Sequence, residues 1–163
     1  ELFISNNNTC NFMRRYDHAL KMKICAPAFP KIQNFGTGRV FTSDTLHGAF
    51  FQLENRSASG TVDLILDMDS LVVASHTGVA DVALRGKARV ANYFNQGLGL
   101  FQADEMHAVH VYANNSSIQD MSIRGMGYLF ARIDYSGNIY YAGSPTQIDL
   151  DERSNGRLLP LQH

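Results

Sequence analysis

Glycine or serine recurs about every twenty residues in this chain, and this period constrains the fold more than any other feature. Successive markers lie 18, 19, 20, 20 and 19 residues apart, and each follows a small or polar turn-forming residue: Gly60, Gly78, Gly97, Ser117, Gly137 and Gly156. Self-similarity at such a period is typical of solenoid proteins, in which each repeat forms one coil. We therefore expect the markers to form one column at a corner of a solenoid.

Between the markers the sequence alternates with the period of a β-strand. Val62, Leu64, Leu66 and Met68 are separated by single, mostly polar residues, which gives a strand with one apolar face. No long stretch keeps a capped helical stripe. The chain is therefore predicted to be all-β, a single-stranded parallel β-helix of about six coils, right-handed because parallel crossovers have that hand.

Stacking of the coils predicts columns of inward side chains. Spacings of 18 and 19 residues suggest one aromatic column: Tyr93, Tyr112 and Phe130. A second, aliphatic column is predicted at four further positions: Val73, Val90, Val109 and Leu129. A β-sandwich is the alternative fold, because short strands at intervals of about 8–12 residues also suit it. The period itself favours the β-helix.

Length and composition predict one domain over residues 1–163, with 45% hydrophobic and 18% charged residues. Glu1 is not an initiator Met, and Leu2 and Ile4 already resemble strand residues, so we expect the native protein to continue upstream. We expect residues 158–161 to fold over the last coil as a cap, because Pro160 cannot donate to a further ladder. An uncapped end would allow self-association through strand edges.

Charge and hydropathy exclude two classes of partner. The net charge is -1 and the isoelectric point is about 6.7, which argues against a nucleic-acid partner. No apolar run is long enough for a membrane-spanning helix. Cys10 and Cys25 are too few for a disulfide framework. We expect Cys25 to be a buried free thiol, and a bridge to Cys10 is the alternative for an exported protein.

One acidic cluster could carry chemistry on such a scaffold. Asp63, Asp67 and Asp69 should point outward together from one strand, where carboxylates could perform acid–base catalysis or hold Ca²⁺. Arg85 and Lys87 follow one coil later and would supply the basic partners of a polysaccharide-cleaving enzyme. A solvated outer face explains the same residues, and we favour that interpretation.

Two further groups of residues only superficially resemble functional sites. His107 and His110 are three apart in a strand, so their rings should face opposite sides and not bind one metal ion. Ser43, Asp44 and His47 have the residue types of a hydrolytic triad, but no nucleophile elbow accompanies them. We therefore expect no catalytic residue, no cofactor and no metal site.

Residues 136–145, SGNIYYAGSP, resemble the closing element of the putative auto-transporter adhesin, head GIN domain family, and Asn155-Gly156 is similar to its last glycine turn. Residues 20–40 are similar to an upstream part of the same family. The acidic turn residue of the family is matched at three positions: Asp63, Asp81 and Asp120. It is replaced at three others: Arg39, Leu100 and Tyr140.

The resemblance implies an exported protein of the periplasm, outer-membrane surface or extracellular space, and it supplies no catalytic residues. We expect a non-enzymatic, adhesin-like module with a binding or structural role, whose partner is a surface glycan or protein. The competing hypothesis is a polysaccharide-acting enzyme that uses the outward acidic face at Asp63, Asp67 and Asp69.

Overall fold

The computed structural model describes residues 2–5 and 21–161, and within these residues the regular structure consists of strands. The strands are β1 (Lys31–Asn34), β2 (Arg39–Phe41), β3 (Leu46–Asn55), β4 (Thr61–Ser75), β5 (Asp81–Asn95), β6 (Phe101–Asn115), β7 (Met121–Ile133), β8 (Ile139–Gly143), β9 (Gln147–Glu152) and β10 (Leu158–Pro160). Nothing in this described part forms a helix long and apolar enough to cross a membrane.

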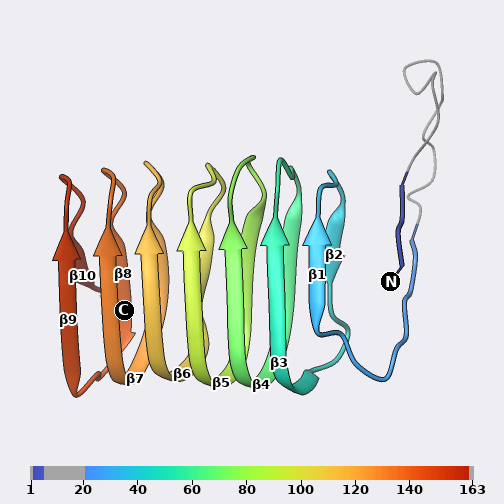
Figure 1. Ribbon diagram of the computed structural model, residues 1–163, viewed down its shortest axis with the longest axis horizontal. Coiled ribbons are helices and arrows are strands. Elements are labelled where there is room, and N and C mark those ends of the chain that lie inside the picture. Colours follow the sequence, from blue (N-terminus) through green and yellow to red (C-terminus); the bar gives the residue numbers. More distant parts are fainter. Residues whose placement is uncertain (1, 6–20, 162–163) are drawn as a thin grey trace.

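Each long strand bends once and so contributes to two layers (Figure 1). In β4 the ladder with β5 pairs Met68 with Ala88 and resumes at Ser70 with Val90, so the bend lies at Asp69. The part before the bend forms what we call the first face, and the part after it forms the second face. On the second face the segments are 31–34, 50–55, 70–75, 90–95, 110–115, 128–133 and 147–152.

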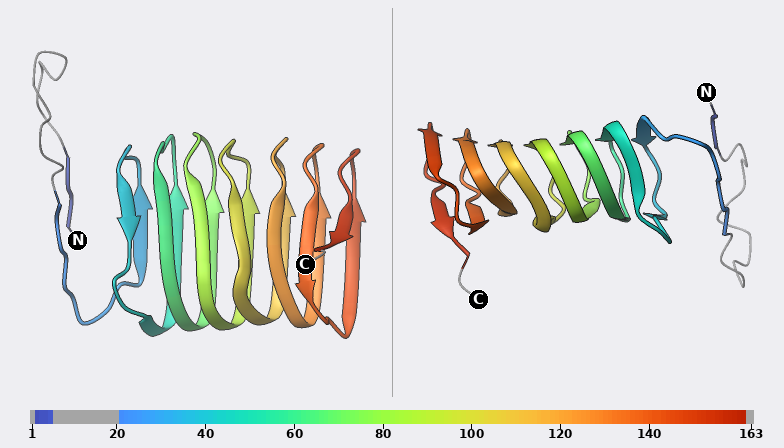
Figure 2. Two further views of the ribbon diagram at one scale, coloured as in Figure 1. Left: turned by 180° about the vertical axis from the view of Figure 1, so that it is seen from behind. Right: turned by 90° about the horizontal axis from the view of Figure 1, so that it is seen from below.

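All of the strand pairs are parallel, and the chain forms a solenoid of about six turns (Figure 2). Thr61 pairs with Asp81 and Phe101 with Met121, which is the twenty-residue period of the sequence. Followed along the axis in Figures 1 and 2, the coil is right-handed, as parallel crossovers normally are. The predicted β-helix is thus confirmed, whereas the alternative β-sandwich would require antiparallel sheets.

The core lies between the two faces and is built from the alternating apolar residues. Val62, Leu64 and Leu66 are almost wholly buried, as the alternation predicted. Large side chains from successive coils join them: Phe51, Leu71, Leu84, Phe101, Met106, Met121, Ile123 and Leu129. Burial of one such side chain stabilises the fold by about 1.5–3 kcal/mol, and neighbouring coils share this apolar interior.

The predicted column of small residues is correct except at its first member. The hydroxyl of Ser117 donates to the Gly97 carbonyl oxygen at 2.5 Å, and the Gly137 N–H donates to the Ser117 carbonyl at 2.9 Å. A β-bridge, however, joins Gly78 to Ala58. Gly60 lies one column further along, where its carbonyl accepts the N–H of Asp81. Alanine also fits this corner, so a glycine-based count is out of register by two residues.

Both predicted side-chain columns are wrong in register. Tyr93 points inward beside Val73 and Ala113, whereas Tyr112 and Phe130 share an outward column with Asn92. The predicted aliphatic column mixes positions as different as buried Leu129 and Val109, which is 45% exposed. The offset between coils varies from 17 to 20 residues in β5, β6 and β7, and a shift by one residue turns a side chain to the other face.

An asparagine ladder lies at the end of the second face, and the sequence analysis did not identify it. Asn34 Nδ2 donates to Asn55 Oδ1 at 3.1 Å, and Asn95 Nδ2 donates to Asn115 Oδ1 at 3.3 Å. Ser75 occupies the position between these pairs. As a result, Asn55 Nδ2 and Asn95 Oδ1 are buried without a hydrogen-bond partner.

The ends of the solenoid differ from the predictions. Residues 158–160 do not fold over the last coil but extend the ladder as β10, with Leu158 beside Ile139 of β8. Ile148 and Leu150 of β9 remain 40% and 47% exposed. At the other end, residues 2–5 are exposed and form no strand. Cys25 is an exposed free thiol rather than a buried one, and Cys10 lies outside the described residues.

Candidate functional site

The acidic cluster that could have formed a catalytic site is neutralised by basic side chains on the first face. Asp63 accepts hydrogen bonds from Arg39 of β2, at 3.1 Å, and from Arg85 of β5. It therefore lies between cations of the coils on either side. This arrangement replaces the solvated or singly bonded carboxylate that the sequence predicted.

Asp67 is also enclosed by basic groups. Its Oδ2 is 3.3 Å from His47 Nδ1 and 3.2 Å from Lys87 Nζ. These residues and His107 line an open depression on the first face. Asp69 is exposed at the bend. The three acids thus do not converge, and the described residues contain no group of three or more His, Cys, Asp or Glu that could hold a metal ion.

The two histidines lie on different faces of the solenoid. His107 pairs with Lys87 on the first face, whereas His110 lies beyond the bend and pairs with Tyr128 on the second face. Both side chains are exposed. The prediction that they cannot share a metal ion is supported by the geometry, although both point outward. His47 contacts Asp67 rather than Asp44, so no triad forms.

The acidic turn residues connect successive coils. Asp81 Oδ1 accepts the N–H of Leu100 at 2.8 Å, and Asp120 Oδ1 accepts the N–H of Asn138 at 2.7 Å. The column is made of Arg39, Thr61, Asp81, Leu100, Asp120, Asn138 and Arg157. Asp63 and Tyr140, which the sequence comparison placed in it, lie two residues away on the first face. This column binds backbone amides and leaves no free acidic row.

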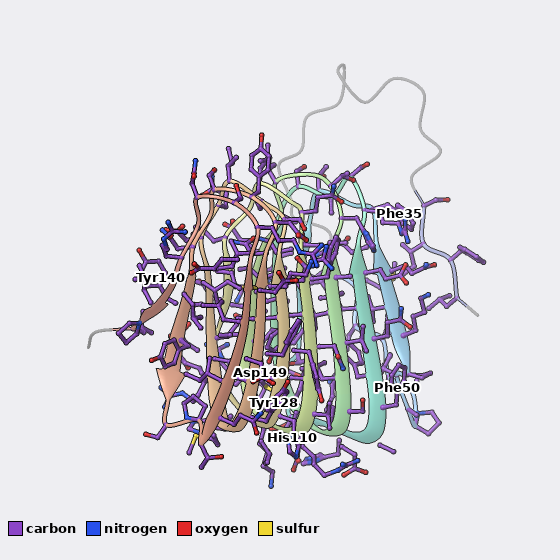
Figure 3. All side chains as sticks on the ribbon, turned by 60° about the vertical axis from the view of Figure 1, so that its left-hand side comes forward. Phe35, Phe50, His110, Tyr128, Tyr140 and Asp149 are labelled. Carbon is purple, nitrogen blue, oxygen red and sulfur yellow. The ribbon has the colours of Figure 1, made fainter. Side chains whose placement is uncertain are left out.

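Aromatic side chains instead gather on the outer surface of the second face. The Tyr112 ring centroid lies 5.6 Å from that of Tyr128 and 6.4 Å from that of Phe130. Phe94 and Asn92 complete what we call the aromatic face, which contains a shallow open depression also lined by Val72, Asn114 and Arg132. In Figure 3, Tyr128 lies between Asp149 and His110 on this surface. Tyr112 is 41% exposed, so the rings face solvent.

The parallel ladder fixes the positions of these rings. Asn92 of β5, Tyr112 of β6 and Phe130 of β7 occupy one outward column, and Asp149 of β9 follows them. His110 and Tyr128 occupy the adjacent column. Because parallel strands lie about 4.8 Å apart, the column presents a ring or an amide at each coil along the axis.

A hydrogen bond holds the hydroxyl of Tyr128 at the edge of the aromatic face. It donates to Asp149 Oδ2 at 2.7 Å. This bond raises the pKa of Tyr128, because the neighbouring carboxylate disfavours a phenolate. The ring is thereby kept neutral and in a fixed orientation.

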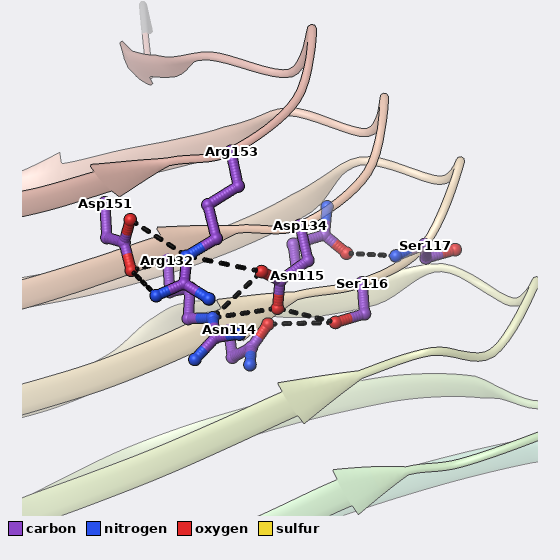
Figure 4. A network of polar contacts seen from close by, with 8 residues as sticks. All are labelled: Asn114, Asn115, Ser116, Ser117, Arg132, Asp134, Asp151 and Arg153. Atoms are coloured by element: carbon purple, nitrogen blue, oxygen red, sulfur yellow. Dashed lines mark hydrogen bonds and ion pairs between the residues drawn. The ribbon is translucent and has the colours of Figure 1, made fainter.

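A polar network borders the aromatic face near the turns (Figure 4). Arg132 Nε donates to both carboxylate oxygens of Asp134 at 2.9 Å, and Ser116 donates to Asp134 at 3.3 Å. Partial burial alone would raise the pKa of Asp134, but the hydrogen bond from Arg132 outweighs it and the pKa is lowered. Arg153 extends the network to Asp151 at 2.7 Å. Arg132 is therefore a paired charge.

Sequence reasoning selected Tyr112 and Phe130 but treated them as core and missed their neighbours. Asn92 and Phe94 lie on either side of buried Tyr93, so correct parity in β5 would have placed both of them outside. The available signal was the alternation within each strand, and the count of nineteen residues between coils overrode it.

Comparisons with known proteins give one family and one solved structure. A family model described as putative auto-transporter adhesin, head GIN domain, matches residues 1–145. Its end coincides with Pro145, the last residue of the segment that resembled the closing element, so Asn155-Gly156 lies beyond it. A comparison with curated proteins finds no match.

The chain is also similar to the crystal structure of a putative adhesin from Bacteroides fragilis, at 27% sequence identity and a TM-score of 0.69. The similarity covers 76% of this chain and 56% of that one. The chain therefore spans little more than half the length of that structure.

Proposed function

The chain belongs to the putative auto-transporter adhesin, head GIN domain family, and from this premise we propose that it is an exported, adhesin-like binding module of the cell surface. It acts without catalysis, and the aromatic face is its binding surface. The ligand is a component of a cell or matrix surface.

The observation that carries this proposal is the outward cluster of Tyr112, Tyr128 and Phe130 on a flat, rigid sheet. Exposed aromatic groups on a folded protein are costly to leave unpartnered, and they are enriched where proteins bind ligands. A parallel ladder holds the backbone beneath them, so little ordering is needed on binding.

The chemistry of the first face supports a binding role over an enzymatic one. A glycosidase requires two carboxyl groups flanking one bond, with one of them kept protonated. Asp63 and Asp67 instead each pair with two basic side chains. The similarity to an adhesin from Bacteroides fragilis points to the same class of role and to an exported location.

A binding screen tests the proposal. The purified chain is applied to immobilised envelope glycans and matrix proteins, in parallel with Tyr112→Ala and Tyr140→Ala. Tyr140 is a matched control because it is a half-exposed tyrosine on the first face, in register with Ser122. We expect at least one surface component to be retained by the wild type and by Tyr140→Ala and lost by Tyr112→Ala.

Two outcomes would contradict the proposal. One is that no surface component binds. The other is that binding survives Tyr112→Ala and is lost with Tyr140→Ala, which would move the site to the first face. Hydrolysis of a polysaccharide that stops on Asp63→Asn would instead support the enzyme hypothesis.

A further inference from the structure

We propose that the aromatic face binds an uncharged oligosaccharide that runs along the solenoid axis across β5, β6 and β7. This inference rests on the proposed binding function and specifies the chemistry of the ligand. It follows from the charge, ring geometry and unpaired polar groups of the second face.

The two faces of the same coils differ in charge. On the first face, the outward side chains of β4 to β7 include seven formal charges: Asp63, Asp67, Arg85, Lys87, Asp104, Glu105 and Arg124. On the second face, the described outward side chains of these strands include one permanent formal charge, Arg132, and Asp134 pairs it. An electrostatically neutral surface favours a neutral ligand, because a charged one would lose hydration without gaining a counter-charge.

The rings form a platform rather than a pocket. Tyr112 contacts Tyr128 in the next coil at 5.6 Å and Phe130 at 6.4 Å. The depression beside them is open and shallow. A pyranose has an apolar face of C–H groups that packs flat on an aromatic ring, and successive sugars of a chain can contact successive rings. A compact apolar molecule would need the enclosure that this surface lacks.

Unpaired polar groups lie beside the rings. The Asn92 amide and the Tyr112 hydroxyl make no hydrogen bond within the described part of the chain, and they occupy adjacent positions of one column. An amide supplies donors and an acceptor, and a phenol supplies one of each. Sugar hydroxyls also donate and accept, so they complement these groups without any charge. Asp149, which accepts the Tyr128 hydroxyl, continues the column as an acceptor.

The test measures binding of the full chain to two neutral polysaccharides, a β-glucan and a mannan, and to polygalacturonate as an anionic probe. Titrations are made at low and at high NaCl. We expect at least one neutral polysaccharide to bind with an affinity that salt does not change, because no phosphate-like or carboxylate contact is involved. Tyr112→Ala should raise Kd roughly tenfold, since loss of one aromatic contact costs about 0.5–1.5 kcal/mol.

Three further variants make the result specific. Tyr112→Phe keeps the ring and should weaken binding less than Tyr112→Ala. Asn92→Ala removes the amide and should weaken binding even if the alanine at position 112 lowers folding yield. Tyr140→Ala, on the first face, should bind as the wild type does. Circular dichroism melting curves identify any variant that fails to fold.

The inference is overturned if binding is restricted to polygalacturonate and weakens with salt. It is also overturned if neutral polysaccharides fail to bind while a matrix protein binds in the surface screen and is lost in Tyr112→Ala. In that last case the proposed binding function stands and only the ligand class is wrong. If no surface component binds at all, both proposals fail together.

Discussion

At the scale of single residues, the solenoid depends on polar side chains that connect neighbouring coils. Asn115 is fully buried, and its Nδ2 donates to the carbonyl oxygens of Gln119 at 2.9 Å and Asn138 at 3.1 Å. Its Oδ1 accepts from Asn95. Buried amides of this kind stabilise the fold when all of their hydrogen-bonding groups are satisfied. The interruption at Ser75 leaves two such groups without partners.

Completing the ladder should stabilise the protein. In Ser75→Asn, a carboxamide can accept from Asn55 Nδ2 and donate to Asn95 Oδ1, the two unpaired atoms. Each new hydrogen bond is worth about 1 kcal/mol, so we expect the midpoint of urea denaturation to rise. Ser75→Ala is the control and should not raise it. A Ser75→Asn variant no more stable than Ser75→Ala would show that this corner cannot accommodate the larger side chain.

The Glu54 carboxylate predicts how stability depends on pH. Hydrogen bonds from Gln33 and Lys31, together with one from Arg56, lower its pKa from 4.5 to about 2. A group whose pKa is lower in the folded state stabilises the fold above its unfolded pKa and loses this contribution as the pH falls. The contribution of Glu54 should therefore be complete above pH 4.5 and decline toward pH 2.

Urea denaturation at several pH values checks this expectation. Wild type and Glu54→Gln should differ most at neutral pH and converge as the pH approaches 2. Asp44→Asn is a suitable control, because Asp44 is exposed in the turn between β2 and β3. A difference between wild type and Glu54→Gln that stays constant across this range would contradict the assigned cause.

At the scale of secondary structure elements, close packing of successive coils requires glycine at particular strand positions. Gly86 of β5 has a φ of +115°, and a Cβ there would overlap the Leu66 carbonyl oxygen of β4. Gly125 of β7 differs, because its Cβ would lie 3.7 Å from the nearest side-chain atoms. The two glycines therefore have different roles in the same ladder.

Alanine substitutions should separate these roles. Gly86→Ala combines a positive φ with a backbone clash and should lower the free energy of unfolding by at least about 2 kcal/mol. Gly125→Ala makes ordinary contacts and should change it by less than about 1 kcal/mol. Thermal denaturation followed by circular dichroism measures both. Equal destabilisation by the two variants would contradict the packing of β4 against β5.

The sequence predicted the type of element and the period but not the registers between coils. Alternation in Val62, Leu64 and Leu66 correctly identified an inward face. The offset between coils, however, varies with bulges and turn lengths, and β6 pairs with β7 at more than one offset. No local signal reveals a bulge of this kind. Tyr93 was therefore assigned to the column of Tyr112, and the aromatic face was mistaken for part of the core.

At the scale of the whole molecule, one coil geometry produces two surfaces of different chemistry. The first face carries crossed ion pairs between coils, such as Asp63 with Arg39 and Arg85. The second face carries neutral rings and amides. Since each coil contributes to both, the faces are fixed relative to each other by the core, and a ligand on the aromatic face meets a preformed surface.

The most direct test of the central claim, that the aromatic face is the binding surface, follows individual tyrosine rings. The chain contains seven tyrosines, and ring-¹³C labelling with single Tyr→Phe substitutions assigns each NMR signal. On addition of the surface component retained in the binding screen, the account predicts shifts at Tyr112 and Tyr128 and none at Tyr140. Shifts confined to Tyr140, or spread equally over all of the tyrosines, would contradict it.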